Sequence, residues 1–189
     1  MNWFFSATRI AGSAFPVSSM LVQFQAELDV EKVNNRLHKL VNPISALHDD
    51  INDISDLIYN EIKRSDDLFI EFDRDVYRKF SRVLAVLEKS SFIKGFHTIG
   101  SERFAKGLTI TDPTYVLYLS ALFENEKKME IIFKTVDSCD IGQTLKGKQI
   151  KEEVGVPLPV IKAVFDIFEE KGYGTCSKAI GSAVYIGTA

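Results

Sequence analysis

The most regular pattern of apolar positions in the chain lies between Val30 and Ile58. Apolar residues recur there in steps of three and four, at Val30, Val33, Leu37, Leu40, Ile44, Leu47, Ile51, Ile54 and Ile58. This 3.5-residue repeat is typical of the seam of a coiled coil or of an antiparallel helix pair. Asn42-Pro43 fits an N-cap followed by the first position of a helix, where proline is tolerated. The pattern therefore predicts either two helices that meet near Asn42 or one kinked helix.

The apolar seam also predicts how the N-terminal part of the chain associates. Residues 29–50 form a heptad helical segment, and we expect a homodimer through Val33, Leu37, Leu40, Ile44, Leu47 and Ile51. The flanking positions lack the alternating Glu and Lys that select a partner helix, so packing against the chain's own core is the alternative. Residues 1–28 carry several aromatics between Gly, Pro and Ser, and we expect an arm that lies on another surface.

The C-terminal third shows three amphipathic helical patterns. Residues 126–137 place Met129, Ile132, Phe133 and Val136 on one face, and residues 146–154 form a second helix that Gly155 ends. A third helix follows Val156–Pro159, with Ile161, Val164, Phe165 and Phe168 on one face. Gly172-Tyr173-Gly174 ends this helix, and residues 175–177 and 183–186 can form a short hairpin. The pattern predicts a helix-turn-helix followed by a wing.

The stretch KGKQIKEEVGVPLPVIKAVFDIFEEKGYG resembles the winged-helix superfamily in its second and third helices. The resemblance implies a winged-helix unit over residues 127–189, and no particular family within the superfamily is recognised.

An internal repeat predicts a second copy of this unit upstream. At an offset of 81 residues, matching residues recur along a helix and into the wing: Phe80, Val83, Leu84, Leu87, Glu88 and Phe92 match Ile161, Val164, Phe165, Phe168, Glu169 and Tyr173. We therefore expect a first winged-helix unit at 51–112, with helices at 51–64, near 67–73 and at 74–89 and a wing at 92–111. The segment DDLFIEFDRD is as strand-like as it is helical. Asp112-Pro113 predicts the start of a connecting helix within residues 113–126.

Taken together, these patterns predict a mostly α fold with small β-wings, in which an N-terminal heptad helical segment precedes two tandem winged-helix units. The 189 residues are 46% hydrophobic and 26% charged, a mixture typical of a soluble globular protein. The net charge is -3, so any nucleic-acid site must be a local patch.

The first predicted unit offers such a patch. Arg74, Arg78 and Arg82 recur every four residues and are expected on one helix face, with Lys79 beside them. Lys94, Arg103 and Lys106 lie in the predicted wing. These seven residues are the candidate site for double-stranded DNA, because phosphate binding needs several converging basic side chains. The third helix of the second unit begins with apolar Val156–Pro159 and continues with acidic residues, which makes it a poor DNA-binding element.

These features predict a non-enzymatic DNA-binding regulator or chromosome-associated factor. The alternative is a tandem winged-helix scaffold that binds a protein partner and contacts DNA little or not at all. In architecture, the chain resembles the kleisin-interacting subunits of condensin-like complexes and the small subunits of endosomal sorting complexes. The acidic total, the apolar Val156–Pro159 edge and the heptad segment suit that class.

Catalytic and cofactor motifs do not occur in the sequence. Neither a P-loop nor a GxGxxG or GxSxG motif is present, so we expect no enzymatic activity and no cofactor. Two cysteines and three scattered histidines give no metal-ligand spacing, so no metal site is expected. The N-terminus lacks the basic region of a signal peptide, and no apolar run is long enough to span a membrane. We therefore expect a cytoplasmic protein without a membrane partner.

Overall fold

The computed structural model describes residues 46–97, 99, 106–124, 126–177 and 183–188, and it is mostly helical with two small antiparallel sheets. The N-terminal arm and most of the predicted dimer seam, Val33, Leu37, Leu40 and Ile44, lie outside the described residues, as does the side chain of Leu47. The sixth residue of that seam, Ile51, is buried in the chain's own core, as are Ile54 and Ile58. At this end of the heptad pattern, packing is therefore within the chain.

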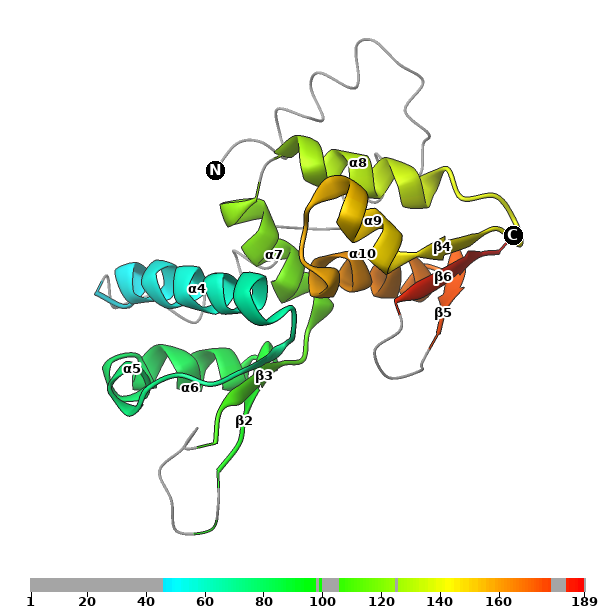
Figure 1. The fold of residues 1–189 in the computed structure, drawn as a ribbon. Coiled ribbons are helices and arrows are strands. Elements are labelled where there is room, and N and C mark those ends of the chain that lie inside the picture. The colour runs from blue at the N-terminus through cyan, green and yellow to red at the C-terminus, as the bar shows by residue number, and fades with distance from the viewer. Residues whose placement is uncertain (1–45, 98, 100–105, 125, 178–182, 189) are drawn as a thin grey trace.

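The described elements form two halves with the same order of helices and strands (Figure 1). The first half consists of α4 (Ala46–Ser65), β1 (Phe69–Ile70), α5 (Arg74–Lys79), α6 (Ser81–Lys89), β2 (Ile93–Gly95) and β3 (Leu108–Ile110). The second half consists of α8 (Glu126–Asp137), β4 (Thr144–Lys146), α9 (Gly147–Val154), α10 (Leu158–Glu170), β5 (Gly174–Cys176) and β6 (Val184–Gly187). The helix α7 (Pro113–Phe123) connects the two halves.

The two sheets also share one topology. Their strand orders are β1-β3-β2 and β4-β6-β5, so in each half the last strand lies between the other two. All four pairings are antiparallel. In each half the short first strand therefore pairs with the last strand and becomes the third strand of the sheet, next to the hairpin that follows the third helix.

A glutamate at the end of the third helix makes the same hydrogen bond in both halves. Glu88 Oε1 accepts the N–H of Gly95 at 3.0 Å, and Glu169 Oε1 accepts the N–H of Cys176 at 2.8 Å. Both partners lie 81 residues apart, which is the offset of the sequence repeat. The side chain ties the helix to the first strand of the hairpin, and this tie explains why an acidic residue recurs in an otherwise apolar match.

The ends of the third helices also have equivalent backbone geometry. Ser91 and Gly172, again 81 residues apart, both have positive φ angles, 62° and 81°. Thr111 Oγ1 donates to the carbonyl of Ser91 at 2.9 Å, and Thr188 Oγ1 donates to that of Gly172 at 3.4 Å. The repeat therefore extends from the helix through the turn to the last strand.

The hydrophobic core is continuous through both halves and centres on α7. All residues from Tyr115 to Ser120 are buried, because this helix packs against α4 on one side and α10 on the other. The Asp112 carboxylate accepts the N–H of Thr114 at 2.8 Å and caps the helix, as the Asp112-Pro113 pair predicts. The core positions predicted from the repeat, Phe80, Leu84, Phe165 and Phe168, are all buried, which confirms the helix phases.

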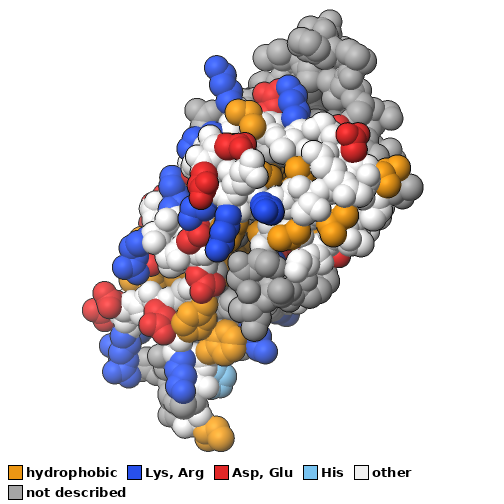
Figure 2. Space-filling view, turned by 45° about the vertical axis from the view of Figure 1, so that its right-hand side comes forward, with side chains coloured by type: hydrophobic (Ala, Val, Ile, Leu, Met, Phe, Trp, Pro, Cys, Tyr) orange, Lys and Arg blue, Asp and Glu red, His pale blue; other side chains and the backbone are white. Residues whose placement is uncertain are grey.

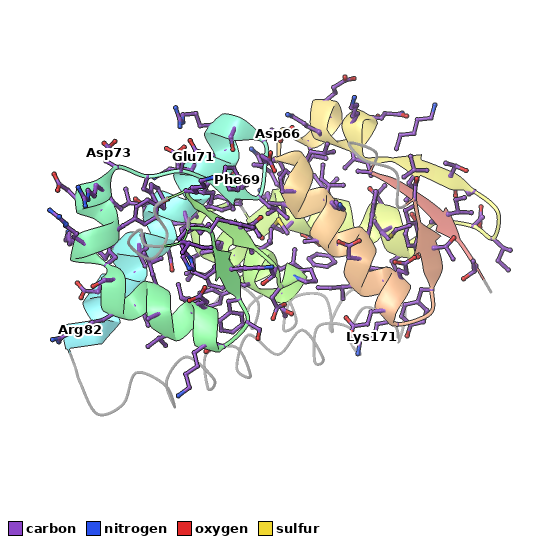
Figure 3. The ribbon with its side chains drawn as sticks, turned by 90° about the horizontal axis from the view of Figure 1, so that it is seen from below. Asp66, Phe69, Glu71, Asp73, Arg82 and Lys171 are labelled. Carbon is purple, nitrogen blue, oxygen red and sulfur yellow. The ribbon has the colours of Figure 1, made fainter. Side chains whose placement is uncertain are left out.

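A single aspartate joins the two halves at the start of α10. Asp66 accepts a hydrogen bond from the Leu158 N–H at 2.7 Å, and its other oxygen lies 2.7 Å from Lys151 Nζ. The residue at the N-cap of α10 is Pro157, whose side chain makes no capping bond. The first half therefore supplies the carboxylate that caps a helix of the second half (Figure 3).

A second polar joint lies where α4, α7 and α8 meet. The Glu124 side chain is only 4% exposed and lies 3.0 Å from Lys63 Nζ and 3.6 Å from Lys128 Nζ. Lys128 also donates to the carbonyl of Gly155 at 3.0 Å. Burial, together with the charge of Glu124, raises the pKa of the Tyr59 hydroxyl above its ordinary value. The buried carboxylate thus holds three helices and the turn after α9 in one arrangement.

The structure corrects two elements of the first half. The predicted helix over 74–89 is two helices, because Phe80 leaves helical geometry (φ -99°, ψ 15°) and places its ring in the core. Figure 1 shows α5 nearly end-on and α6 from the side, so the two axes differ. The predicted short helix near 67–73 is instead the strand β1, which pairs with β3. The corresponding strand of the second half, β4, has no counterpart among the predicted elements.

Candidate nucleic-acid interface

The first half carries a local excess of positive charge that the whole-chain value hides. Residues 74–106 contain eight Lys and Arg but only three Asp and Glu, whereas the chain as a whole has a net charge of -3. This segment includes α5, α6 and β2 and ends just before β3, so the positive charge lies on the part of the first half that the sequence analysis selected.

The three arginines predicted on one helix face lie on two helices. Arg74 and Arg78 are exposed on α5, whereas Arg82 is exposed on α6, because the helix breaks at Phe80. Lys79 Nζ lies 3.9 Å from Asp53 Oδ2 and 4.6 Å from the centre of the Phe80 ring. The expected stripe is therefore wrong as a single face, although its members remain exposed on neighbouring helices.

The exposed side of α6 is basic. Val83, Leu84 and Leu87 pack into the core, which leaves Arg82 and Lys89, two turns apart, at the surface. Lys89 was not among the predicted site residues, although its spacing of seven from Arg82 is a helical signal.

The basic residues of the predicted wing form a separate group. Lys94 is exposed on β2, and its Nζ lies 5.7 Å from the centre of the Phe96 ring. Lys106 is exposed where the chain returns toward β3, and its N–H donates to the Phe96 carbonyl at 2.9 Å. The remaining predicted residue, Arg103, lies outside the described part.

In Figure 3, Arg82 lies at one end of the first half, away from Phe69 and Glu71 beside the hairpin. The helical and wing groups are therefore two patches rather than one.

The third helix of the second half is mostly buried. Eight residues of α10 are buried, including Ile161, Val164 and Phe165, and Lys162 is exposed beside them. Val156, Pro157 and Pro159 are buried as well, so the apolar edge expected to suit a protein partner is covered by this chain itself. The sequence predicts that the second half is a poor DNA-binding element because of its acidic residues. The burial of most of α10 is a second reason to expect this.

Asp166, Glu169 and Cys176 bring one ligand atom each within 4.8 Å of one another. Glu169 is held there because it accepts the backbone N–H of Cys176. Glu88 accepts the N–H of Gly95 in the same way in the first half, where no thiol is present. The arrangement therefore follows from the repeated helix-to-strand tie.

None of the helices in the described part of the chain combines the length and apolar character that crossing a membrane requires. In comparisons with known proteins, no family model, curated sequence or solved structure matches the chain.

Proposed function

We propose that the two halves are tandem winged-helix units and that the first unit binds double-stranded DNA. Each half has the order helix, strand, helix, helix, strand, strand, with the last strand central in its sheet. A helix-turn-helix followed by a hairpin is the arrangement that such units use on DNA. The equivalent hydrogen bonds of Glu88 and Glu169 support a true structural repeat.

The observation that carries this proposal is the excess of basic residues over 74–106, set against the acidic remainder of the chain. A winged helix places its third helix, the recognition helix of the helix-turn-helix, in the major groove, and here α6 presents Arg82 and Lys89 to solvent. Each phosphate that a basic side chain neutralises releases counterions, so binding through these residues is strongly salt-dependent.

The second unit serves in this proposal as a structural support. The N-terminus of a helix attracts anions, including the phosphates of DNA, through its free N–H groups and its dipole. At α10 that position is taken by the Asp66 carboxylate, which accepts the Leu158 N–H. A duplex would have to displace this carboxylate before a phosphate reached the N-terminus of α10.

Fluorescence anisotropy with a random duplex at several salt concentrations tests the proposal. We expect salt-dependent binding that Arg82→Glu with Lys89→Glu weakens. The slope of log K against log salt should become smaller by the contribution of roughly two phosphate contacts. The matched control is Lys148→Glu with Lys162→Glu, an equal charge change on exposed residues of the second unit. Equal losses from both pairs would show that the roles of the units are assigned wrongly.

The second candidate function is a scaffold that binds other proteins, and a homodimer is compatible with either function. The observation that favours a scaffold is that the second unit already uses its helix-turn-helix for a protein contact, through Lys151 and Leu158 on Asp66. Absence of duplex binding even at low salt would favour this candidate over the first.

A further inference from the structure

The outer face of the first sheet exposes two phenylalanines. Phe69 on β1 is 40% exposed and Phe96, just after β2, is 36% exposed. Their ring centroids are 5.9 Å apart, with an interplanar angle of 64°. Hydrophobic and basic side chains lie together at this end of the molecule (Figure 2). Exposed aromatic pairs on a sheet are a recurring platform for unpaired bases.

The two rings border a groove whose walls are held in place by contacts within the chain. Its volume is about 570 Å³, and it is lined by Phe69, Glu71, Phe72, Tyr77, Phe96, Lys106 and Gly107. The Tyr77 hydroxyl accepts the Phe72 N–H at 2.9 Å, which fixes one wall. Gly107 has a φ of 109°, and a Cβ there would lie 2.9 Å from Phe69 Cζ. The absence of a side chain at Gly107 therefore lets the Phe69 ring lie close over the backbone.

The charges around the groove suit a nucleotide. Lys94 Nζ lies near the Phe96 ring, and Lys106 lines the groove, held beside Phe96 by its backbone N–H. The phosphates that adjoin a bound base would therefore have two lysines within the same surface. Glu71 lines the groove as well, and a carboxylate can accept hydrogen bonds from the amino group of a base.

The second half shows that the fold does not require these aromatics. Phe69 and Lys94 both face Thr109 across the first sheet, and Thr144 and Thr175 both face Ile186 across the second. The Phe96 N–H donates to the carbonyl of Gly107, and in the second half the corresponding donor is Ser177. The same topology is therefore built with hydroxyl side chains where the first half has two phenylalanines and a lysine.

We propose that this groove binds an unpaired nucleotide, with its base against Phe69 and Phe96 and its phosphates at Lys94 and Lys106. The inference rests on the proposed DNA-binding function and specifies its substrate as a duplex that carries a single-stranded end. Stacking on aromatic side chains tolerates any base, so the preference is for an unpaired strand rather than for a sequence.

The test compares a labelled blunt duplex with the same duplex carrying a short single-stranded overhang, by anisotropy with the full chain. We expect the wild type to bind the overhang duplex about tenfold more tightly, in keeping with the strength of one base stack. Phe69→Thr with Phe96→Ser installs the residues of the equivalent positions in the second half. This variant should lose the preference and keep its affinity for the blunt duplex.

The control variant is Ile186→Ala, which removes an exposed apolar side chain from the equivalent face of the second sheet and should keep the preference. Urea denaturation of each variant establishes that its fold is retained. The inference is overturned if the wild type binds both duplexes equally, or if the preference survives the double substitution. In either case, binding to the blunt duplex would still support the proposed function. Binding to neither DNA overturns both, and the exposed aromatics would then belong to a protein contact.

Discussion

Replacement of Asp66 tests whether one carboxylate holds the two halves together. We expect Asp66→Gly to lower the free energy of unfolding by about 2 kcal/mol, because it removes a charged hydrogen bond to the Leu158 N–H that acts as a helix cap. The ion pair with Lys151 contributes less, about 0.2–1 kcal/mol, since both side chains are partly exposed. Glycine is chosen because Asp66 has a φ of 57°, which alanine would adopt only with strain.

Urea denaturation measures the loss, and hydrogen exchange locates it in the first turn of α10. Lys151→Met removes only the ion pair, so it should cost a fraction of the loss in Asp66→Gly. Ser91→Gly is the matched control for the flexibility that glycine adds, because Ser91 is exposed and also has a positive φ. If Asp66→Gly proves no less stable than Ser91→Gly, the capping argument is refuted.

Three further predictions address the core, the alkaline limit of stability and the oligomeric state. Phe165 is 1% exposed, so Phe165→Ala should lower the free energy of unfolding by about 3–5 kcal/mol, and an unchanged urea midpoint would contradict its place in the core. Burial, aided by the nearby Cys139, raises the pKa of Tyr185 from 10.0 to about 12, so the folded state keeps a proton that the unfolded chain loses. Its stabilising contribution is complete below pH 10.0 and falls as the pH rises toward 12, and Tyr185→Phe should make the fall in urea stability over that interval shallower. Leu40→Lys with Leu47→Lys should convert a dimer into a monomer in light scattering, and a wild type that is already monomeric at high concentration would contradict the predicted seam.

Strong local signals account for the elements that could be predicted from the sequence. The helix predicted at 126–137 has the bounds of α8, and Gly155 ends α9 with a φ of 68°, as a helix-terminating glycine should. The strands β1 and β4 were harder, because two or three residues are too few to show an alternating pattern. The break at Phe80 was missed since Arg74, Arg78 and Arg82 continue a helical spacing across it.

The candidate site depended on contacts that sequence spacing does not record. Asp66 caps a helix that begins at Leu158, and no local motif connects residues so far apart in the chain. The meeting of Phe69 and Phe96 likewise depends on the pairing of β1 and β2 with β3 between them. Lys89 could have been found from its spacing to Arg82 alone. The sequence therefore identifies the candidate side chains, whereas the strand order determines which of them come into contact.

The distribution of charge and the burial of α10 point to the same surface. A net charge of -3 argues against nucleic-acid binding only if the charge is spread evenly, and it is not, because residues 74–106 are basic while the remainder is acidic. The third helix of the second half, α10, is mostly buried and lies in the acidic part. The third helix of the first half, α6, exposes Arg82 and Lys89 and lies in the basic part. A polyanion would be attracted to the first unit and repelled by the rest, so the same charges that lower the overall affinity would orient the complex. Neutralising acidic residues of the second unit should therefore strengthen duplex binding without creating a second site, whereas a second site would show that α10 can be released from Asp66 and α7.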